Sequence, residues 1–205
     1  MARKIFISFR YSDGHLYKEK LEQIFDKNDN VINCSESEDR SRYTDNTIKS
    51  YLYSKLRGTS VTIVILTPES IEYKKNWLSN EIDDWIYDEV RYSLENRENN
   101  RPNGLIAIYT PAVEKALLEK RIDSIRIKDF NNLVRKNMFN VLKKYKTNPK
   151  ENIYDSNYDH YCSLVSWEAF ISNSNKYIEI AEFKRDNIDR YEIKARLSDG
   201  NHYYF

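Results

Sequence analysis

The chain has 205 residues, and its 33 basic and 32 acidic side chains give a formal net charge of only +1. This length suits one domain with elaborations or at most two small domains, and the balanced charge disfavours nucleic acid as a partner. The four glycines stand at positions 14, 58, 104 and 200. Because they lie so far apart, the chain contains neither a G-x-G-x-x-G nor a G-x-x-x-x-G-K-[ST] phosphate loop, and a nucleotide would have to be held by other groups.

Cysteine and histidine are also scarce. Two cysteines and three widely separated histidines offer no short-range ligand motif, so we expect no metal site. Sparse cysteine suits a reducing compartment. The apolar runs are shorter than the ~18 residues of a membrane helix, and the run at the N-terminus is too short for a signal peptide. We therefore expect a cytoplasmic protein with no membrane partner.

Short apolar runs alternate with helical periodicity along the first 110 residues. The runs predict strands at 4–9, 31–34, 60–66 and 104–109. Apolar residues at three- and four-residue spacing predict helices at 15–27, 44–58 and 76–95. Asn76 is the candidate N-cap of the third helix. This alternation predicts an α/β fold, in which a parallel sheet of about five strands carries helices on both faces.

The pattern is weaker beyond residue 110. It predicts a helix at 134–145, a fifth strand at 161–167 and a helix at 177–186. We expect one domain over residues 1–190 and a C-terminal extension over residues 191–205. Alternating residues around the sequence Ser198–Asn201 predict a β-hairpin in this extension, with a disordered tail as the alternative.

Right-handed crossovers and the short second strand favour the strand order 2-1-3-4-5. Ligands of such sheets bind beyond the carboxyl ends of the strands where the order reverses, here between the first and third strands. The loops at this place, residues 8–13, 67–70 and 35–41, are polar and aromatic. They suit a ligand with rings, hydroxyls and phosphates, although ordinary solvated connections have a similar composition.

The predicted third helix offers a candidate catalytic carboxylate. On a 3.6-residue period Trp77, Glu81 and Trp85 share one face, at the margin of the apolar stripe. A carboxylate between two indoles loses water, which raises its pKa and strengthens its hydrogen bonds to a ligand. The alternative is a boundary glutamate that pairs with Lys74, Lys75 or solvent.

For three further groups of residues we prefer a purely structural interpretation to a functional one. The same predicted helix carries the acidic residues Asp83, Asp84, Asp88 and Glu89. They predict a solvated face, and the alternative is a divalent-metal cluster. The basic stretch 135–150 also predicts a solvated face rather than a phosphate-binding one. Cys34 and Cys162 are interpreted as small core residues, although His160 stands close to Cys162 in sequence.

Two segments in this order carry a family resemblance. Residues 4–13 (KIFISFRYSD) resemble the first strand and loop of TIR-like domains, where an F-[IV]-S-[FY] core precedes a polar turn that ends in Asp. Residues 59–70 (TSVTIVILTPES) and 77–82 (WLSNEI) are similar to the third strand and the W-x-x-x-E helix of the family. The resemblance covers residues 3–110 and points to the bacterial TIR-like proteins of Thoeris-type antiphage defence. It implies a flavodoxin-like/TIR-like three-layer fold.

The resemblance implies an enzyme that cleaves the N-glycosidic bond between nicotinamide and ribose in NAD, with Glu81 as the catalytic residue. A carboxylate there would stabilise the positive charge left on the ribose and accept hydrogen bonds from its hydroxyls. NAD is the substrate, and no cofactor is implied. The implied substrate-binding residues are Phe9 and Trp77 for rings, Arg10 for a phosphate, Ser8 and Asp13 for ribose or adenine, and Ser35 after the second strand.

The implied product is a cyclic or otherwise modified ADP-ribose that activates a separate effector protein, and TIR-type enzymes often assemble as homo-oligomers. Many members carry an Asp after the second strand, where this chain has Asn33-Cys34-Ser35, so substrate contacts at this place would differ. The alternative is a non-catalytic TIR-like module for protein interaction or assembly. A third interpretation is a flavodoxin-like phosphate or nucleotide binder that does not cleave NAD.

Overall fold

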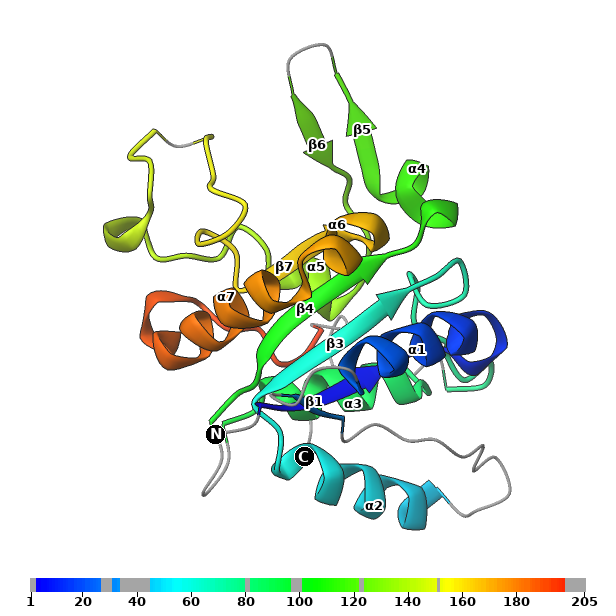
Figure 1. The fold of residues 1–205 in the computed structure, drawn as a ribbon. Coiled ribbons are helices and arrows are strands. Elements are labelled where there is room, and N and C mark those ends of the chain that lie inside the picture. The colour runs from blue at the N-terminus through cyan, green and yellow to red at the C-terminus, as the bar shows by residue number, and fades with distance from the viewer. Residues whose placement is uncertain are drawn as a thin grey trace.

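A parallel sheet of five strands lies at the centre of the computed structural model (Figure 1). The structure describes residues 3–26, 31–33, 45–79, 82–96, 101–121, 124–150 and 152–197. The strands are β1 (Arg3–Ser8), β2 (Val31–Asn33), β3 (Val61–Leu66), β4 (Gly104–Tyr109) and β7 (Cys162–Ser166). Their order, β2-β1-β3-β4-β7, confirms the predicted order, with β7 as the fifth strand.

Helices cover both faces of this sheet. One face carries α1 (Tyr11–Phe25), α6 (Trp167–Ser172) and α7 (Ser174–Asp186), and the other carries α2 (Asp45–Arg57), α3 (Trp85–Leu94) and α5 (Leu133–Lys136). Because side chains alternate along a strand, Ile63 of β3 packs with α1 and α7, whereas Val64 packs with α3 and α5. The predicted three-layer α/β fold is confirmed.

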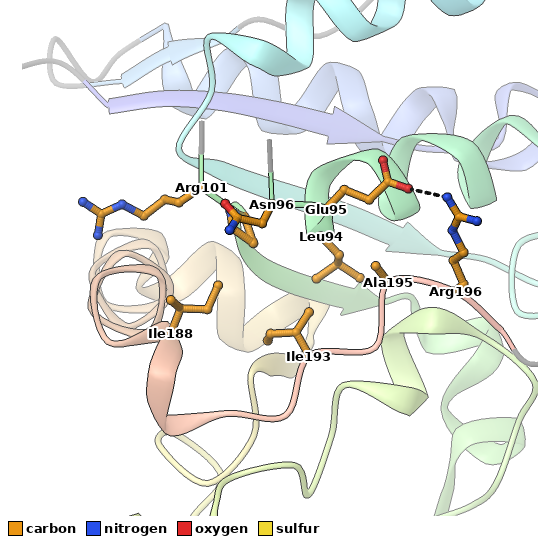
Figure 2. Close-up of a pocket in the computed structure, with 9 residues that line it drawn as sticks. Leu94, Glu95, Asn96, Arg101, Ile188, Ile193, Ala195 and Arg196 are labelled. Atoms are coloured by element: carbon orange, nitrogen blue, oxygen red, sulfur yellow. Dashed lines mark hydrogen bonds and ion pairs between the residues drawn. The ribbon is translucent and has the colours of Figure 1, made fainter. Parts of the chain in front are cut away.

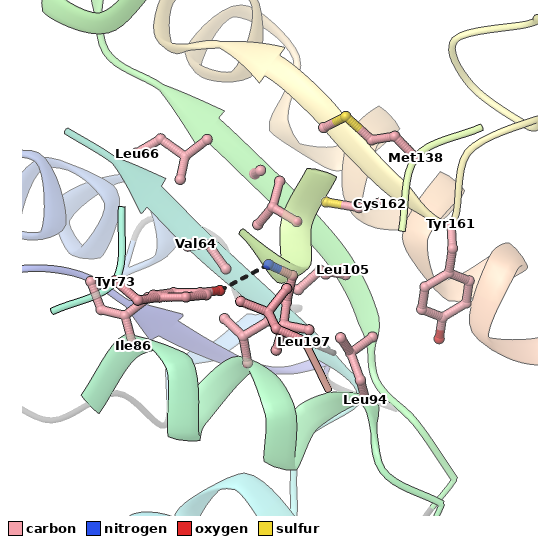
Figure 3. Packing of buried hydrophobic residues seen from close by; sticks show 14 of the residues in the cluster. Val64, Leu66, Tyr73, Ile86, Leu94, Leu105, Met138, Tyr161, Cys162 and Leu197 are labelled. Atoms are coloured by element: carbon pink, nitrogen blue, oxygen red, sulfur yellow. Dashed lines mark hydrogen bonds between the residues drawn. The ribbon is translucent and has the colours of Figure 1, made fainter. Parts of the chain in front are cut away.

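The core on the α3 face includes polar atoms that are paired (Figure 3). The Tyr73 hydroxyl accepts a hydrogen bond from the Leu133 N–H at 3.2 Å and donates one to Asn132 Oδ1 at 2.8 Å. Burial raises the pKa of this phenol well above its ordinary value. The loop after β3 is thereby fixed to the start of α5.

The helix predicted at 76–95 begins at Trp85, so the prediction was wrong for the described residues 76–79 and 82–84. Asn76 does not cap a helix: its Oδ1 accepts from the N–H groups of Leu78 and Ser79, at 2.9 and 3.2 Å, and closes a turn. Asp84 is the N-cap, because its Oδ1 accepts from the Ile86 N–H at 2.9 Å. Trp77 and Trp85 therefore do not share a helical face, and Glu81 lies outside the described residues.

The prediction was also wrong in parts of the C-terminal half. The helix expected at 134–145 ends at Lys136, and Phe139 has a left-handed φ of 56° that a helix cannot continue through. A short helix α4 (Glu114–Leu117) and an antiparallel hairpin, β5 (Leu118–Lys120) with β6 (Ile125–Ile127), were not predicted. The hairpin projects away from the sheet (Figure 1).

Short 3-10 turns and extended chain complete the described structure. The turns are η1 (Pro111–Val113), η2 (Lys143–Tyr145) and η3 (Ile188–Arg190). The helix expected at 177–186 is confirmed as part of α7. The turn expected at 198–201 lies outside the described residues. Across the described ranges, no helix has the length and apolar character needed to cross a membrane.

Candidate functional site

The carboxyl ends of β1 and β3 lie side by side, because Ser8 pairs with Val64 near the ends of both strands. Strand order reverses here, since β2 lies on one side of β1 and β3 on the other. Open α/β sheets bind ligands at this point. The candidate site is therefore built from residues that follow β1, residues that follow β3 and the start of α3.

Asp13 in the first turn of α1 joins two of these segments. Its Oδ1 accepts from Thr67 Oγ1 at 2.7 Å and its Oδ2 accepts from the Glu69 N–H at 3.0 Å. Ser12 Oγ adds a 2.7 Å hydrogen bond to Glu69 Oε2. Both carboxylate oxygens of Asp13 thus hold the loop after β3 against α1, and this contact fixes the shape of the site.

Arg10 joins the end of β1 to the start of α3. Its Nη2 donates to Asp84 Oδ2 at 2.5 Å. The buried Asp84 also accepts from the Lys74 N–H at 2.7 Å and from the Ile86 N–H at 2.9 Å. Its carboxylate therefore caps α3 and orients the guanidinium. The Nε of Arg10 is buried, and the described part of the chain gives it no hydrogen-bond partner.

Ser8 and Glu89 lie behind this ion pair, between β1 and α3. Ser8 is fully buried, and its Oγ has no partner within ordinary hydrogen-bond geometry among the described residues. The pKa of the nearby Glu89 carboxyl is raised to about 8, mainly by burial; Asp84 and Asp88 also act to raise it, whereas Ser8 and Arg10 act to lower it. The carboxyl of Glu89 is thus mostly protonated at neutral pH.

Sequence reasoning placed Asp84 and Glu89 on a solvated acidic face, and that interpretation was wrong for both. Asp84 is buried and Glu89 is partly buried, with its carboxyl directed inward, whereas Asp83 on the same stretch is exposed. A signal for Asp84 does exist in the sequence, because Asp followed by an apolar periodic segment is a helix-start pattern. Glu89 also has a local signal, because it stands four residues after Trp85 and completes a second W-x-x-x-E sequence, which lies inside α3.

Within the described ranges no cluster of metal-binding side chains is found.

The structure brings together part of the predicted site. Ser8 and Arg10 lie in one cluster with Asp84 and Glu89. Phe9 is half-buried and packs on Gly14, where an added Cβ would lie 3.3 Å from Phe9 Cβ. Trp77 is 87% exposed and stands outside any helix. Ser35 and Glu81 lie outside the described residues.

Three cavities lie elsewhere in the described structure. The one of about 740 Å³ lies at the amino end of β4, where Leu94 of α3 faces Ile193 and Ala195 (Figure 2). Two smaller ones, of about 350 and 310 Å³, involve the 141–154 segment and the β7–α7 region. None of these three is lined by a predicted site residue.

Cys162 is a core residue, as predicted. It is fully buried, and burial raises the pKa of its thiol to about 12. Burial lowers the pKa of the neighbouring residue His160 to about 4, so this imidazole is neutral at pH 7. Cys34 lies outside the described residues.

The parallel sheet, its strand order and the polar cluster at the reversal point define a TIR-like α/β domain. A family model described as "Thoeris protein ThsB, TIR-like domain" matches residues 6–115, just over half of the 205 residues. The chain belongs to this family. The matched range contains Ser8, Arg10, Asp84 and Glu89, and membership links the protein to antiphage defence and to other defence proteins.

Proposed function

We propose that this protein cleaves NAD between nicotinamide and ribose. The observation that carries the proposal is the Arg10–Asp84 ion pair, which fixes a guanidinium at the ligand-binding edge of a TIR-like sheet. A guanidinium held in this way suits a pyrophosphate. The product, a cyclic or otherwise modified ADP-ribose, then activates a separate effector protein of the defence system.

In this proposal Glu81 is the catalytic residue. Departure of nicotinamide leaves positive charge on the ribose, and the Glu81 carboxylate stabilises that charge and accepts hydrogen bonds from the ribose hydroxyls. Nicotinamide leaves as a neutral ring, so the reaction needs no general acid. Further substrate contacts come from Ser8, Phe9, Asp13, Ser35 and Trp77. NAD is the substrate and no cofactor takes part.

The test is incubation of the purified protein with NAD, with and without lysate from phage-infected cells, followed by chromatography of the products. We expect release of nicotinamide, and a loss of roughly 100-fold or more in Glu81→Gln, because one charge-stabilising group contributes about that much. Glu72→Gln is the matched control, since Glu72 is an exposed carboxylate between β3 and α3. Absence of nicotinamide release in every condition would contradict the proposal, and full activity of Glu81→Gln would contradict the assigned mechanism.

A non-catalytic role in protein interaction is the second candidate, and one observation favours it. Trp77 and Leu78 are 87% and 75% exposed and adjacent on the turn before α3. Large apolar side chains exposed side by side are typical of partner-binding surfaces. This candidate predicts that Trp77→Ala weakens self-association or partner binding, measured by light scattering, while the protein releases no nicotinamide.

A further inference from the structure

The basic stretch 135–150 does not form the solvated helix face that was expected. The helix ends at Lys136, and the rest of the stretch is irregular chain around the turn η2. The stretch has six cationic residues and no acidic one, although the whole chain is almost neutral; Glu151, which follows it, lies outside the described residues. Positive charge is therefore concentrated in a non-helical segment, beyond the range that the family model matches.

Part of this stretch borders the cavity of about 350 Å³. This volume lies near the lower end of the roughly 300–1,000 Å³ that small-molecule sites occupy, so it suits one nucleotide better than a dinucleotide. The lining combines apolar and aromatic surface with two ammonium groups and one amide: Val141, Lys143, Lys146, Pro149, Asn152 and Tyr154.

Two anchors fix the backbone beside the lysines of the cavity. The buried Asp159 accepts through Oδ1 from the N–H and from the Oγ1 of Thr147, each at 2.9 Å. The Leu142 N–H donates to a backbone oxygen of η3 at 2.8 Å. Lys143 follows Leu142 and Lys146 precedes Thr147 in the sequence. The backbone that carries both ammonium groups is thus held before a ligand arrives, which lowers the entropic cost of binding.

Aromatic rings orient two cations of the stretch. Lys146 Nζ lies 4.1 Å from the ring centroid of Tyr154, and Lys144 Nζ lies 4.7 Å from that of Tyr145. No ion pair with a described carboxylate is found for Lys143 or Lys144. A ring attracts an ammonium without cancelling its charge, so the positive charge of this surface remains available to an anion.

We propose that this cavity is a second ligand site, which binds a free nucleotide through its phosphate and its base. Lys143 and Lys146 hold the phosphate, and the base lies against Pro149 and the Tyr154 ring. The Asn152 amide both donates and accepts, and it therefore matches the edge of adenine, where N6 donates and N7 accepts. The cavity shares no residue with the site proposed for NAD cleavage, so this inference does not depend on that reaction.

The experiment is a titration of the whole chain with AMP, followed by amide NMR and by calorimetry. We expect a dissociation constant of roughly 0.1–1 mM, because the lining is largely exposed and supplies few polar groups. Amide shifts should change within residues 141–154 and stay constant within residues 8–13. Adenosine and inorganic phosphate, each tested alone, should bind at least about fivefold more weakly, because each makes only part of the contacts.

A charge variant tests the position of the phosphate. Lys143→Gln should weaken AMP binding about fivefold, since a unit charge ~4 Å from a phosphate contributes about that much at a water-exposed site. It should leave adenosine binding unchanged. Lys136→Gln is the matched control, because Lys136 is an exposed lysine of the same stretch that does not line the cavity, and it should behave as the wild type.

Four results would contradict the inference. The first is an absence of shift changes at about 10 mM AMP, and the second is a set of changes confined to residues 8–13 and 67–70, which would place AMP at the edge of the sheet. Equal AMP affinity of Lys143→Gln and wild type would overturn the proposed binding mode. An oligodeoxyadenylate of about ten nucleotides that binds more than about tenfold tighter than AMP would assign the surface to a single strand instead of a free nucleotide.

Discussion

Lys184 of α7 is fully buried, and its Nζ donates a hydrogen bond to Ser163 Oγ of β7 at 2.7 Å. Burial lowers the pKa of this ammonium from its ordinary 10.5 to about 7, because the low-dielectric core disfavours the charged form. The unfolded chain keeps the proton up to about pH 10.5. Between these values the unfolded state binds more protons than the folded state, so the contribution of Lys184 makes stability rise with pH.

Lys184→Met should therefore stabilise the protein at pH 7, by about 2 kcal/mol, and should remove the part of the pH dependence between pH 7 and 10 that Lys184 causes. Methionine fills a similar volume and has no charge to desolvate. Urea unfolding at pH 7, 8.5 and 10 measures the effect, with Lys20→Met as the control because Lys20 is exposed on α1. A less stable Met variant at pH 7 would show that the ammonium is charged and well compensated in the folded protein.

The sequence predicted the positions of some site residues but not the contacts that they make. Ser8 and Arg10 follow a short apolar run, so their position at the end of a buried strand was predictable. Their partners were not, because the Arg10–Asp84 ion pair joins residues 74 positions apart. Glu89 could have been noticed from its W-x-x-x-E spacing after Trp85, but its burial depends on the contact of α3 with β1, which local sequence does not encode.

At the scale of elements, buried strands were predicted well and helix ends poorly. Runs such as Val61–Leu66 are covered on both faces, and their continuous apolar character is a strong local signal. The start of α3 was ambiguous, because Asn76 and Asp84 are both capping residues ahead of a tryptophan. Asp84 is the actual cap, and its carboxylate also accepts hydrogen bonds from Arg10 and from the Lys74 N–H. Tertiary contacts thus selected one of two acceptable local patterns.

The close contact between α7 and β4 can be tested with one substitution. A Cβ on Gly104 would lie 2.3 Å from the backbone oxygen of Ala181, so Gly104→Ala requires α7 to move. We expect a loss of about 2–3 kcal/mol in the free energy of unfolding. Gly58→Ala is the control, because its nearest neighbour would be 3.9 Å away, and it should be neutral or slightly stabilising. Thermal and urea unfolding compare the two variants, and equal stability would show that α7 can shift at little cost.

At the scale of the whole molecule, the family match ends before the sheet is complete. It stops at residue 115, whereas the fifth strand β7 and the covering helices α6 and α7 come later. β4 pairs with β7 from Leu105↔Cys162 to Tyr109↔Ser166, and Ile106 and Ile108 pack in one core with residues of α6 and α7. We propose that residues 1–190 form one domain, of which the matched range is an inseparable part.

A chain cut after residue 115 should therefore fail to fold. It would expose the apolar face of β3 and β4 that α6 and α7 cover, and it would leave β4 as a long apolar edge strand, which favours aggregation. Circular dichroism and size-exclusion chromatography should show loss of cooperative unfolding and formation of aggregates. A chain cut after residue 197 keeps the whole described sheet with its helices, and should melt within a few degrees of the full chain. Cooperative unfolding of the 1–115 piece would contradict this prediction. It would mean that the TIR-like half folds as an independent domain and that its four strands are stable without β7, α6 and α7.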